Sequence, residues 1–492
     1  MDTSDILDLT NTEQTSDYDY SIEKKDIVSY ISPTNTTWGG LNSSAVVFDF
    51  QLTAGSFVDL SSPQTGFLCK FIMRGDAVAA GTGGVDVNRN GTMSSNWFNY
   101  LFQGARLIIN GQEVEYLTNL GVLTDIEYIM RQANNSKELE LAGYIPDGPD
   151  SGESEDSFTT VIDALVPATP TNLNIIAAMK ALTPNPSYNK GYNKRLQTYG
   201  RLTAANQTIY AYVPLSHIFK FCQKATTLLS YLQIKVEFTP KIDTDKQVCY
   251  FGDYLTSAVL TPKLNFSSTN MSGISDMKLA VQGFQLAPSL QLEYEKKIAS
   301  KVNIDFDIRY LEEIESTTTY TTRTITCGSR PRFIFVIPKR GVNYNNPAYN
   351  AQLCPNADIE SVQINFGTTG VYPRFLQQGE FAANKYLEFY SAFSDVARVI
   401  GGCPLDMSIN DFKKLNSIFA FDVRAQPKAT LPTWTFSVNI TRKTVPAAET
   451  ALGTTPTETN PRTVKFYIIV YQERRAMIQQ KIALVEMINP NV

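Results

Sequence analysis

The sequence predicts an all-β protein made of antiparallel β-sandwiches in two tandem halves. Apolar and polar residues alternate in many short segments between residues 46 and 470, long polar connections separate these segments, and helical periodicity is rare. Alternation with a period of two is typical of strands that are buried on one face. Many separate strands joined by long connections favour sandwiches over repeated strand–helix–strand units.

Chain length sets the number of units. A chain of 492 residues is long enough for two or three domains. Residues 1–20 hold six acidic and no basic residues, so we expect a mobile arm there. We place the break between the halves near 290–302, beside the charged stretch Glu293–Lys297. The predicted domains are an N-terminal arm over 1–40, a first sandwich over 41–298, and a second sandwich with a C-terminal tail over 299–492.

The first half contains three clear alternating segments. Each carries large apolar side chains at every second position, with polar or charged side chains between them in most places. The apolar positions are Val46, Phe48, Phe50 and Leu52, then Phe67, Cys69, Phe71 and Met73, then Leu232, Ile234, Val236 and Phe238. We expect these side chains to face the core of the first sandwich.

The second half repeats this pattern in five segments. The alternation is clearest where polar residues separate aromatic and β-branched ones. The apolar positions are Val302, Ile304, Phe306 and Ile308, then Phe333, Phe335 and Ile337, then Val362, Ile364 and Phe366, then Trp434, Phe436, Val438 and Ile440, then Val464, Phe466, Ile468 and Val470. These segments predict the strands of the second sandwich.

Two segments have helical periodicity. Thr124–Glu127 fits a capping box, which predicts that a helix starts there with Ile126, Ile129 and Met130 on its apolar face. A second helix is predicted by apolar residues spaced for one helical face, at Tyr386, Tyr390, Phe393, Ala397 and Ile400. We interpret both helices as insertions between strands.

Long polar connections lie in both halves. Residues 74–96 are rich in Gly, Asn and Ser, residues 146–158 carry five acidic and no basic residues, and residues 442–463 are rich in Pro, Thr and Ala. Connections longer than about 12–15 residues are usually functional or disordered. Their recurrence in both halves predicts large loop insertions.

Composition argues against several classes of protein. The chain has 43 Lys and Arg against 48 Asp and Glu, whereas proteins that bind nucleic-acid phosphates usually carry an excess of base. The single histidine argues against a multi-histidine metal site. Six cysteines without a C-x-x-C pair predict free thiols in a reducing compartment. With no signal pattern and no run of 18 apolar residues, we expect neither secretion nor a transmembrane segment.

Two loop motifs resemble ligand-binding loops without completing them. Residues 86–97 begin like a calcium-binding EF-hand, with Asp86, Asn88 and Asn90 in place, but the twelfth position is Trp97 and not Glu. Residues 81–84 are rich in glycine but lack the Lys and Ser or Thr of a phosphate-binding loop. Polar turns are the simpler interpretation of both, and whether an ion binds at 86–97 stays open.

One group of carboxylates suggests a hydrolytic alternative. Asp305 and Asp307 share one face of a predicted strand, and Glu312, Glu313 and Glu315 follow. Two carboxyl groups about 5–9.5 Å apart in a groove could cleave a glycosidic bond. These positions are also the ones that face solvent opposite the apolar side of the strand, which is the simpler interpretation.

Other reactive groups carry no complete constellation. His217 lies five residues before Cys222, but no orienting acid can be placed beside them, so a buried thiol is the default. Basic residues that could contact phosphate or line the end of a sheet are Arg323, Arg330, Arg332, Lys339 and Arg340. We therefore assign no catalytic, cofactor-binding or metal-ligating residue, and we expect neither enzymatic activity nor a cofactor.

Four segments resemble double jelly-roll major capsid proteins of double-stranded DNA viruses. The segments are Ile209–Phe219, Met277–Leu286, Phe419–Val423 and Phe466–Glu473. They resemble, in order, a late strand of the first jelly roll, its closing strand, the approach to the final strands of the second roll, and its last strand. The resemblance covers most of residues 40–475. It is greatest to polinton, adintovirus and virophage capsid proteins and extends distantly to the adenovirus hexon.

The resemblance implies a structural function. Each half would be an eight-stranded antiparallel jelly roll with long loop insertions and a few short helices. Three chains would form a homotrimer, a pseudo-hexagonal capsomer that tiles an icosahedral shell. Residues 146–158 or 442–463 would form outer towers, and the N-terminal arm would lie inside or reach a neighbour.

The same resemblance implies partners and a location. The partners would be further copies of the chain, together with penton and minor capsid proteins, and no sequence-specific nucleic acid. The chain would reside in the virion capsid after assembly in the host cytoplasm or nucleus. Two other functions stay open from the residues alone: a β-sandwich attachment protein that binds a glycan or receptor, and a carbohydrate-active enzyme that uses the carboxylates near Asp305.

Overall fold

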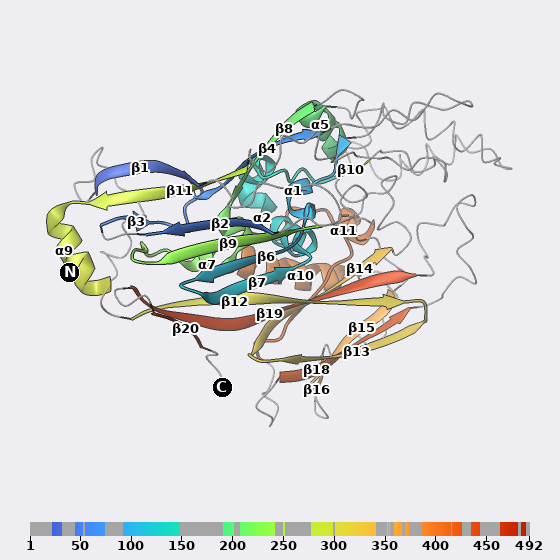
Figure 1. Ribbon diagram of the computed structural model, residues 1–492. Coiled ribbons are helices and arrows are strands. Elements are labelled where there is room, and N and C mark those ends of the chain that lie inside the picture. Colours follow the sequence, from blue (N-terminus) through green and yellow to red (C-terminus); the bar gives the residue numbers. More distant parts are fainter. Residues whose placement is uncertain are drawn as a thin grey trace.

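The structure is a computed structural model, which Figure 1 shows as a ribbon. The described residues are 22–31, 45–52, 55–73, 92–147, 190–200, 207–241, 249–250, 277–298, 301–340, 352, 354, 359–366, 370–372, 386–414, 416–425, 434–442, 463–480 and 484–488. Within them, the strands form four large antiparallel sheets and one two-stranded pair.

The first half forms two of the large sheets. Its strands are β1 (Ile22–Ile31), β2 (Val46–Gln51), β3 (Phe57–Val58), β4 (Gly66–Met73), β5 (Thr92–Met93), β6 (Phe102–Ile109), β7 (Gln112–Thr118), β8 (Gln207–Pro214), β9 (Gln233–Pro240), β10 (Cys249–Tyr250) and β11 (Met277–Leu286). One sheet has the order β1-β11-β4-β8, with β3 added on β11. The other has the order β2-β9-β6-β7, and β10 pairs with β5 separately.

The second half forms the other two large sheets. Its strands are β12 (Val302–Ser316), β13 (Tyr320–Cys327), β14 (Pro331–Arg340), β15 (Ile359–Phe366), β16 (Gly370–Tyr372), β17 (Phe419–Asp422), β18 (Trp434–Arg442), β19 (Val464–Gln479) and β20 (Leu484–Ile488). One sheet has the order β12-β19-β14-β17, with β20 added on β19. The facing sheet has the order β13-β18-β15-β16.

The two halves have the same topology. Setting aside the short strands β3, β5 and β10 and the terminal β20, each half has eight strands, and their chain order gives sheets 1-8-3-6 and 2-7-4-5 in both. Eight antiparallel strands arranged in two facing sheets are a jelly roll. The predicted fold of two tandem jelly rolls is therefore confirmed, and the second half repeats the topology of the first.

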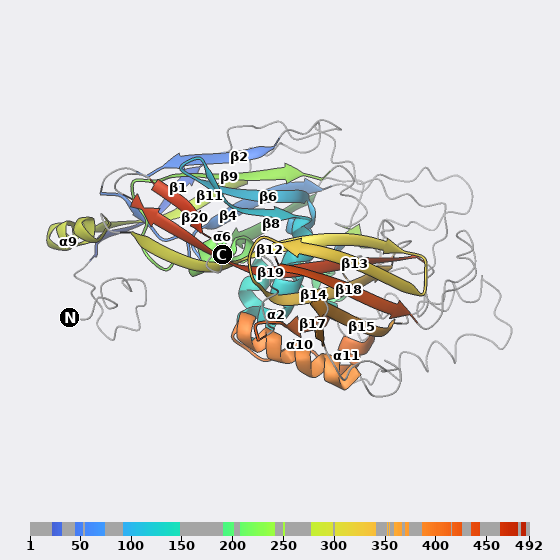
Figure 2. The ribbon, with the colours of Figure 1, turned by 90° about the horizontal axis from the view of Figure 1, so that it is seen from below.

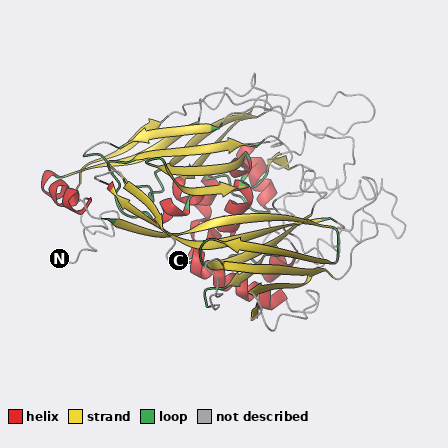
Figure 3. Ribbon diagram, turned by 60° about the horizontal axis from the view of Figure 1, so that its bottom comes forward, coloured by secondary structure: helices red, strands yellow, loops and turns green. Residues whose placement is uncertain are grey.

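Helices occupy equivalent places in the two rolls. They are α1 (Trp97–Tyr100), α2 (Leu120–Leu141), α5 (Lys190–Tyr199), α6 (Leu215–Ile218), α7 (Lys220–Lys224), α9 (Pro288–Ile298), α10 (Tyr386–Gly401) and α11 (Ile409–Lys414). The helices α2 and α5 lie between the fifth and sixth strands of the first roll, and α10 and α11 lie between the fifth and sixth strands of the second. Figure 3 shows most helices gathered between two groups of strands, with α9 apart at one end.

One of the two predicted helices is confirmed, and the predicted start of the other is wrong. The spacing around Phe393 correctly predicts α10, which buries Phe393 and Ala397. The capping box at Thr124 is wrong, because α2 begins four residues earlier, at Leu120. The Thr124 hydroxyl instead donates to the Leu120 carbonyl oxygen at 2.8 Å, inside the helix. The helix extends to Leu120 because that residue and its neighbours Val122 and Leu123 are buried in the core.

Alternation in the first roll matches burial. Along β2, Val46 and Phe48 are buried while Asp49 and Gln51 are exposed, and β9 repeats this with Ile234 and Phe238 buried. The core aromatic rings meet between the sheets: Phe67 of β4 lies 4.9 Å from Phe238 of β9, measured between ring centroids. Sheet-on-sheet packing of this kind buries one face of each strand.

Two strands of the second roll are buried on both faces. Along β14, Ile334 and Val336 are as buried as the predicted core residues Phe333 and Phe335. Along β19, residues 466–471 are all buried. The sheet that contains these strands therefore lies inside the molecule, covered by the second roll on one face and by helices and the first roll on the other. Figure 1 shows this sheet between the strands of the first roll and β13, β15 and β18.

The structure corrects the predicted arm. Residues 22–31 form β1, which pairs with β11 from Ile22 opposite Leu286 to Ile31 opposite Leu279. This segment therefore belongs to the first roll, and an arm cannot extend to residue 40. Its sequence, IEKKDIVSYI, lacks regular alternation, so the pattern gave no signal. The remaining limits of the domains stay a proposal, although every large sheet is composed of strands from one half only.

Candidate functional site

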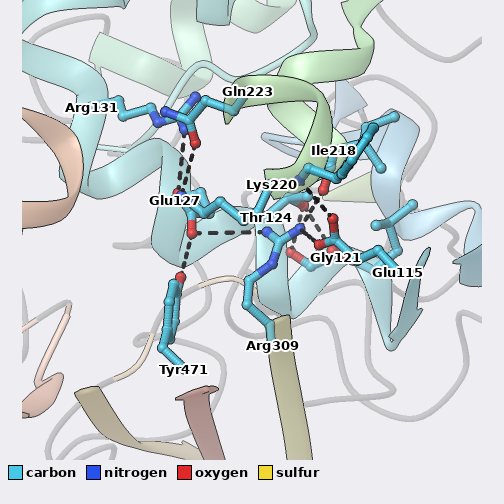
Figure 4. A network of polar contacts seen from close by, with 12 residues as sticks. Glu115, Gly121, Thr124, Glu127, Arg131, Ile218, Lys220, Gln223, Arg309 and Tyr471 are labelled. Atoms are coloured by element: carbon cyan, nitrogen blue, oxygen red, sulfur yellow. Dashed lines mark hydrogen bonds and ion pairs between the residues drawn. The ribbon is translucent and has the colours of Figure 1, made fainter. Parts of the chain in front are cut away.

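The two rolls meet at a buried group of charged residues, which we call the junction. Helix α7 and strand β7 of the first roll lie against β12 of the second, α2 lies against α10, and charged side chains lie between the two rolls (Figure 4). The junction residues come from β7, α2 and α7 on one side and from β12 and β19 on the other. They are Glu115, Glu127, Arg131, Lys220, Arg309 and Tyr471, and all are buried.

Glu127 is the centre of the junction. Its carboxylate accepts a hydrogen bond from Lys220 Nζ at 2.6 Å and lies 3.7 Å from Arg131 Nη2, both within the first roll. From the second roll, the Tyr471 hydroxyl donates to the same carboxylate and Arg309 Nη1 lies 3.8 Å away. One carboxylate on α2 thus holds two strands of the other roll.

Arg309 makes the second connection across the junction. It lies on β12 and reaches into the first roll, where its Nη2 donates to Glu115 Oε1 at 3.0 Å and also to the Ile218 carbonyl oxygen. The other carboxylate oxygen of Glu115 accepts a hydrogen bond from the Phe221 backbone N–H at 3.1 Å. Charged groups removed from water are stable only when paired in this way.

Burial and charge set the protonation of this group. Burial alone would raise the pKa of Glu127, but Lys220, Arg131 and Arg309 outweigh it and lower that pKa to about 2. Burial lowers the pKa of Lys220 to about 8 although Glu127 opposes the shift. At neutral pH Glu127 therefore carries a negative charge opposite at least two fixed positive charges.

A second polar contact joins α2 to β14. Asp125 of α2 accepts a hydrogen bond from the Tyr100 hydroxyl and one from Asn96 Nδ2 at 2.8 Å, and it lies 4.0 Å from Lys339 Nζ of the second roll. Burial raises the pKa of Asp125 to about 6, while Lys339 and the two hydrogen bonds oppose this. Gly401, the last residue of α10, lies so close to α2 that an added Cβ would be 2.2 Å from the Met130 carbonyl oxygen.

The junction can hold the rolls in one relative orientation, and it has the chemistry of a structural contact. Its charged groups are paired with each other and shielded from water. Sequence reasoning missed this group. Its members are distant in the chain, Arg309 and Glu115 being 194 residues apart, and no local pattern connects them.

The carboxylates considered for hydrolysis are held by neighbouring cations. Asp305 is paired with Arg475 at 2.5 Å, which lowers its pKa, and Asp307 is paired with Arg332 at 3.1 Å. Burial raises the pKa of Asp307 against the effect of Arg332.

The glutamates that follow lie on the same strand. Glu312 contacts Arg323, Glu313 lies 3.0 Å from Lys465 Nζ, and Glu315 is exposed. The structure therefore disperses these acids along β12 and pairs four of the five predicted carboxylates with cations.

His217 and Cys222 do not form a catalytic pair. His217 is buried on α6 against the ring of Tyr128, and its Nε2 lies 3.9 Å from a Glu138 carboxylate oxygen. Burial and Arg131 lower the pKa of His217 to about 3, and burial raises the pKa of the Cys222 thiol. Both shifts disfavour the imidazolium–thiolate state. All five cysteines whose side chains are described are buried and free, as predicted.

His217 gives a testable pH dependence. Its pKa is about 3 in the folded chain and 6.5 as the unperturbed value, so the unfolded state binds the proton first. Stability should fall by about 3 kcal/mol between pH 6.5 and pH 4, at about 1.4 kcal/mol per pH unit. Chemical denaturation of the wild type and His217→Gln at several pH values measures this.

The difference in pH dependence between the wild type and His217→Gln reports the contribution of the histidine alone. Asp125 changes the stability of both proteins with pH equally, and in the opposite direction to His217. The pKa of Asp125 is raised in the folded chain, so its contribution to stability grows as pH falls from 6 towards 3.8. A His217→Gln protein whose stability decreases with acid as steeply as that of the wild type would contradict the assignment.

The predicted basic group is dispersed. Arg323 and Arg332 pair with Glu312 and Asp307 on β12, and Arg330 donates to the Arg424 carbonyl oxygen. Lys339 is buried at the second contact beside Asp125, and the side chain of Arg340 lies outside the described residues. The group is therefore not one phosphate-binding surface.

Loop motifs fall mostly outside the described residues. Residues 81–84 and 86–91 lie there, while Trp97, at the position where an EF-hand needs Glu, is buried in the core. Among the residues that the structure describes, no group of three or more His, Cys, Asp or Glu side chains could hold a metal ion. No helix within the described ranges is long and apolar enough to cross a membrane.

Solved structures resemble the chain over nearly its whole length. A structure of the virophage Sputnik matches with a TM-score of 0.60 at 10% identity, covering 98% of this chain and 91% of the other. The mavirus major capsid protein matches with a TM-score of 0.50 at 10% identity, over 98% and 93% of the two chains. VP54 of PBCV-1 matches with a TM-score of 0.50 at 13% identity, over 96% and 98%.

These matches concern the fold, since identity is low throughout. No protein-family model and no curated protein matches the chain. The coverage of both chains and the repeated strand order agree on one architecture. The chain has the double jelly-roll fold of viral major capsid proteins.

Proposed function

We propose that this chain is a structural major capsid protein that forms a homotrimer, a pseudo-hexagonal capsomer of an icosahedral shell. The observation that carries the proposal is the repetition of one jelly-roll topology in both halves of the chain. Three copies of a two-lobed chain give six similar lobes, and such a unit can pack on a hexagonal lattice. The fold shared with the mavirus major capsid protein supports the same function.

The junction supports this proposal physically. A capsomer with six equivalent lobes needs the two lobes of each chain in a fixed orientation. Buried polar or ionic groups fix one arrangement in some proteins, because any other arrangement leaves charges unpaired in the interior. Glu127 with Arg309 and Tyr471 has this character here.

Partners and location follow from the same function. We expect contacts with neighbouring capsomers, with penton and minor capsid proteins, and no sequence-specific nucleic acid, in agreement with the net charge of −5. The chain would reside in the virion capsid after assembly in the host cytoplasm or nucleus. The candidate tower residues 148–158 and 443–462 lie outside the described residues.

Oligomeric state tests the proposal directly. Native mass spectrometry of the purified chain should give three times the 54.8 kDa mass of one copy. Negative-stain microscopy should show units with six lobes, and interfaces on the order of several thousand Å² in total are expected for an obligate assembly. A chain that stays monomeric at every concentration would contradict the proposal.

The alternative functions predict different results. An attachment protein would show saturable binding in a glycan array and no closed particles by microscopy. A hydrolase would lose a measurable activity in Asp305→Asn and Asp307→Asn. Either result together with a monomeric chain would replace the capsid proposal.

A further inference from the structure

The two rolls differ in how much of one sheet is covered. The second roll buries both faces of the β12-β19-β14-β17 sheet, including the face that points away from its own sandwich. On that outer face the buried residues are Phe333, Phe335, Ile337, Tyr467, Ile469 and Tyr471. Since the two rolls share one topology, the matching face of the first roll is the outer face of the β1-β11-β4-β8 sheet.

The first roll leaves part of this matching face exposed. On β4 and β8, which correspond to β14 and β17, the outward side chains include Leu68 at 40% and Tyr210 at 63% exposure. Lys70 and Lys278 are exposed beside them, with Lys70 opposite Tyr210 and Lys278 opposite Leu68. We call these four residues the sheet face. Leu68 and Lys70 lie on the inner strand β4, Lys278 on β11 and Tyr210 on the edge strand β8, so the sheet face presents both apolar and basic side chains.

Within one chain, two helices contact the outer face of the second roll. Helix α10 of the same roll packs on it, with the ring of Phe393 centred 6.3 Å from that of Phe335. Helix α2, the insertion between the fifth and sixth strands of the first roll, contacts Tyr471 through Glu127 and approaches Lys339 through Asp125. The equivalent insertion of the second roll is α10. Repetition of the contact would therefore bring α10 against the sheet face. Figure 2 shows α10 and α11 together along one side of the molecule, with α2 next to them.

One face of α10 is exposed and complements the sheet face. Its buried side carries Phe389, Phe393 and Ala397. The opposite side carries exposed residues that fall on one helical stripe, namely Leu387, Glu388, Ser391, Asp395, Arg398 and Val399. Leu387 and Val399 are 45% and 48% exposed. Asp395 lies 3.9 Å from Arg398 on the same stripe, and Glu388 adds a further acid, so the stripe has a net negative charge, opposite in sign to the lysines of the sheet face.

We propose that the sheet face of one copy binds the exposed stripe of α10 from a neighbouring copy. This inference rests on the proposed function, because it assigns the contact between copies in the trimer. Leu387 and Val399 would cover Leu68 and Tyr210, while Glu388 and Asp395 would lie near Lys70 and Lys278. The contact repeats between chains what α2 and the second roll already do within one chain.

The contact joins two different surfaces, so it is heterologous. Each copy has one sheet face and one α10 stripe, and heterologous contacts close into rings when the rotation between copies allows it. Around a ring of six lobes, a helix-on-sheet contact within one chain would then be followed by a helix-on-sheet contact between two chains. A trimer is the smallest ring in which this alternation gives six lobes.

Two double variants test the contact from its two sides. Leu68→Asp with Tyr210→Asp places acids on the sheet face, and Leu387→Asp with Val399→Asp places them on the stripe. Both should be monomers under conditions where the wild type is a trimer, because each loses buried apolar area and places unpaired carboxylates in the contact. In the sheet-face variant the new acids also meet the acidic stripe. The exposed positions Leu292 and Tyr320 provide the matched control, since both changed to Asp should leave a trimer.

Mixing the two variants tests the pairing itself. The sheet-face variant keeps an intact stripe and the stripe variant keeps an intact sheet face, so the mixture should form dimers with one copy of each. Native mass spectrometry resolves them by mass, and far-UV circular dichroism confirms that each variant is folded before mixing. Neither variant should dimerise alone.

Each contrary outcome has a distinct meaning. Trimers in either variant would overturn this contact and leave the proposed capsid function standing. Two monomeric variants that do not dimerise on mixing would overturn the pairing of sheet face with stripe. A wild-type chain that is monomeric throughout would overturn both proposals.

Discussion

Phe436→Asp is expected to prevent the chain from folding. Phe436 lies on β18, is 1% exposed, and its ring is centred 5.6 Å from that of Phe366 across the same sheet. Loss of a buried Phe side chain costs about 3–5 kcal/mol. A carboxylate without a partner in an apolar core adds several kcal/mol more. The sum approaches or exceeds the total stability of about 5–15 kcal/mol that is usual for a domain.

Solubility and circular dichroism measure this effect. Phe436→Asp should be insoluble or lack the spectrum of the wild type. The matched control is Ser437→Asp, one residue along the same strand, where the side chain is half-buried on the opposite face. Ser437→Asp should fold. Soluble Phe436→Asp with the near-UV spectrum of the wild type would show that the facing of β18 is wrong.

Arg309→Met is expected to destabilise the chain through the junction. The change leaves the buried Glu115 with the Phe221 backbone N–H and without its 3.0 Å ion pair. Removal of one partner from a buried ion pair costs about 3–5 kcal/mol, because the remaining charge stays uncompensated. Glu127 also loses one of its three cations. The midpoint of unfolding in denaturant should fall accordingly.

A double variant separates the charge effect from the loss of packing. Arg309→Met with Glu115→Gln removes both charges, so it should be more stable than Arg309→Met alone. The exposed pair of Arg475 and Asp305 on the same two strands provides the control, and Arg475→Met should leave the midpoint unchanged. A double variant that is less stable than either single variant would show that the junction stabilises the chain by another route.

Fold class could be predicted from the sequence because burial on one face leaves a local trace. A strand with one buried face must place an apolar residue at every second position, as β2, β9 and β18 do. Helix α10 leaves the corresponding trace at helical spacing. The start of α2 was mispredicted because Thr124 and Glu127 match a capping pattern while serving other contacts, Glu127 being the centre of the junction.

Burial on both faces removes the period-two signal. Residues 333–337 of β14 form a continuous apolar run, FIFVI, which alternation alone describes as a strand with one buried face. A continuous apolar run of this kind indicates that a second layer covers the sheet. Helix α10 covers part of it, and the rest of the cover, Glu127 and Asp125 of α2, comes from residues more than 200 positions away in the chain.

The sequence by itself determined that the chain folds as two similar antiparallel sandwiches, because burial of one face places apolar residues at every second position in most of the strands. Only the tertiary structure decided that the second roll is covered by the first, that Arg309 and Glu127 meet between them, and that the sheet face around Tyr210 is left exposed. These features arise from contacts between segments far apart in the chain. Such contacts exist only after both rolls have folded and docked, so no local pattern records them.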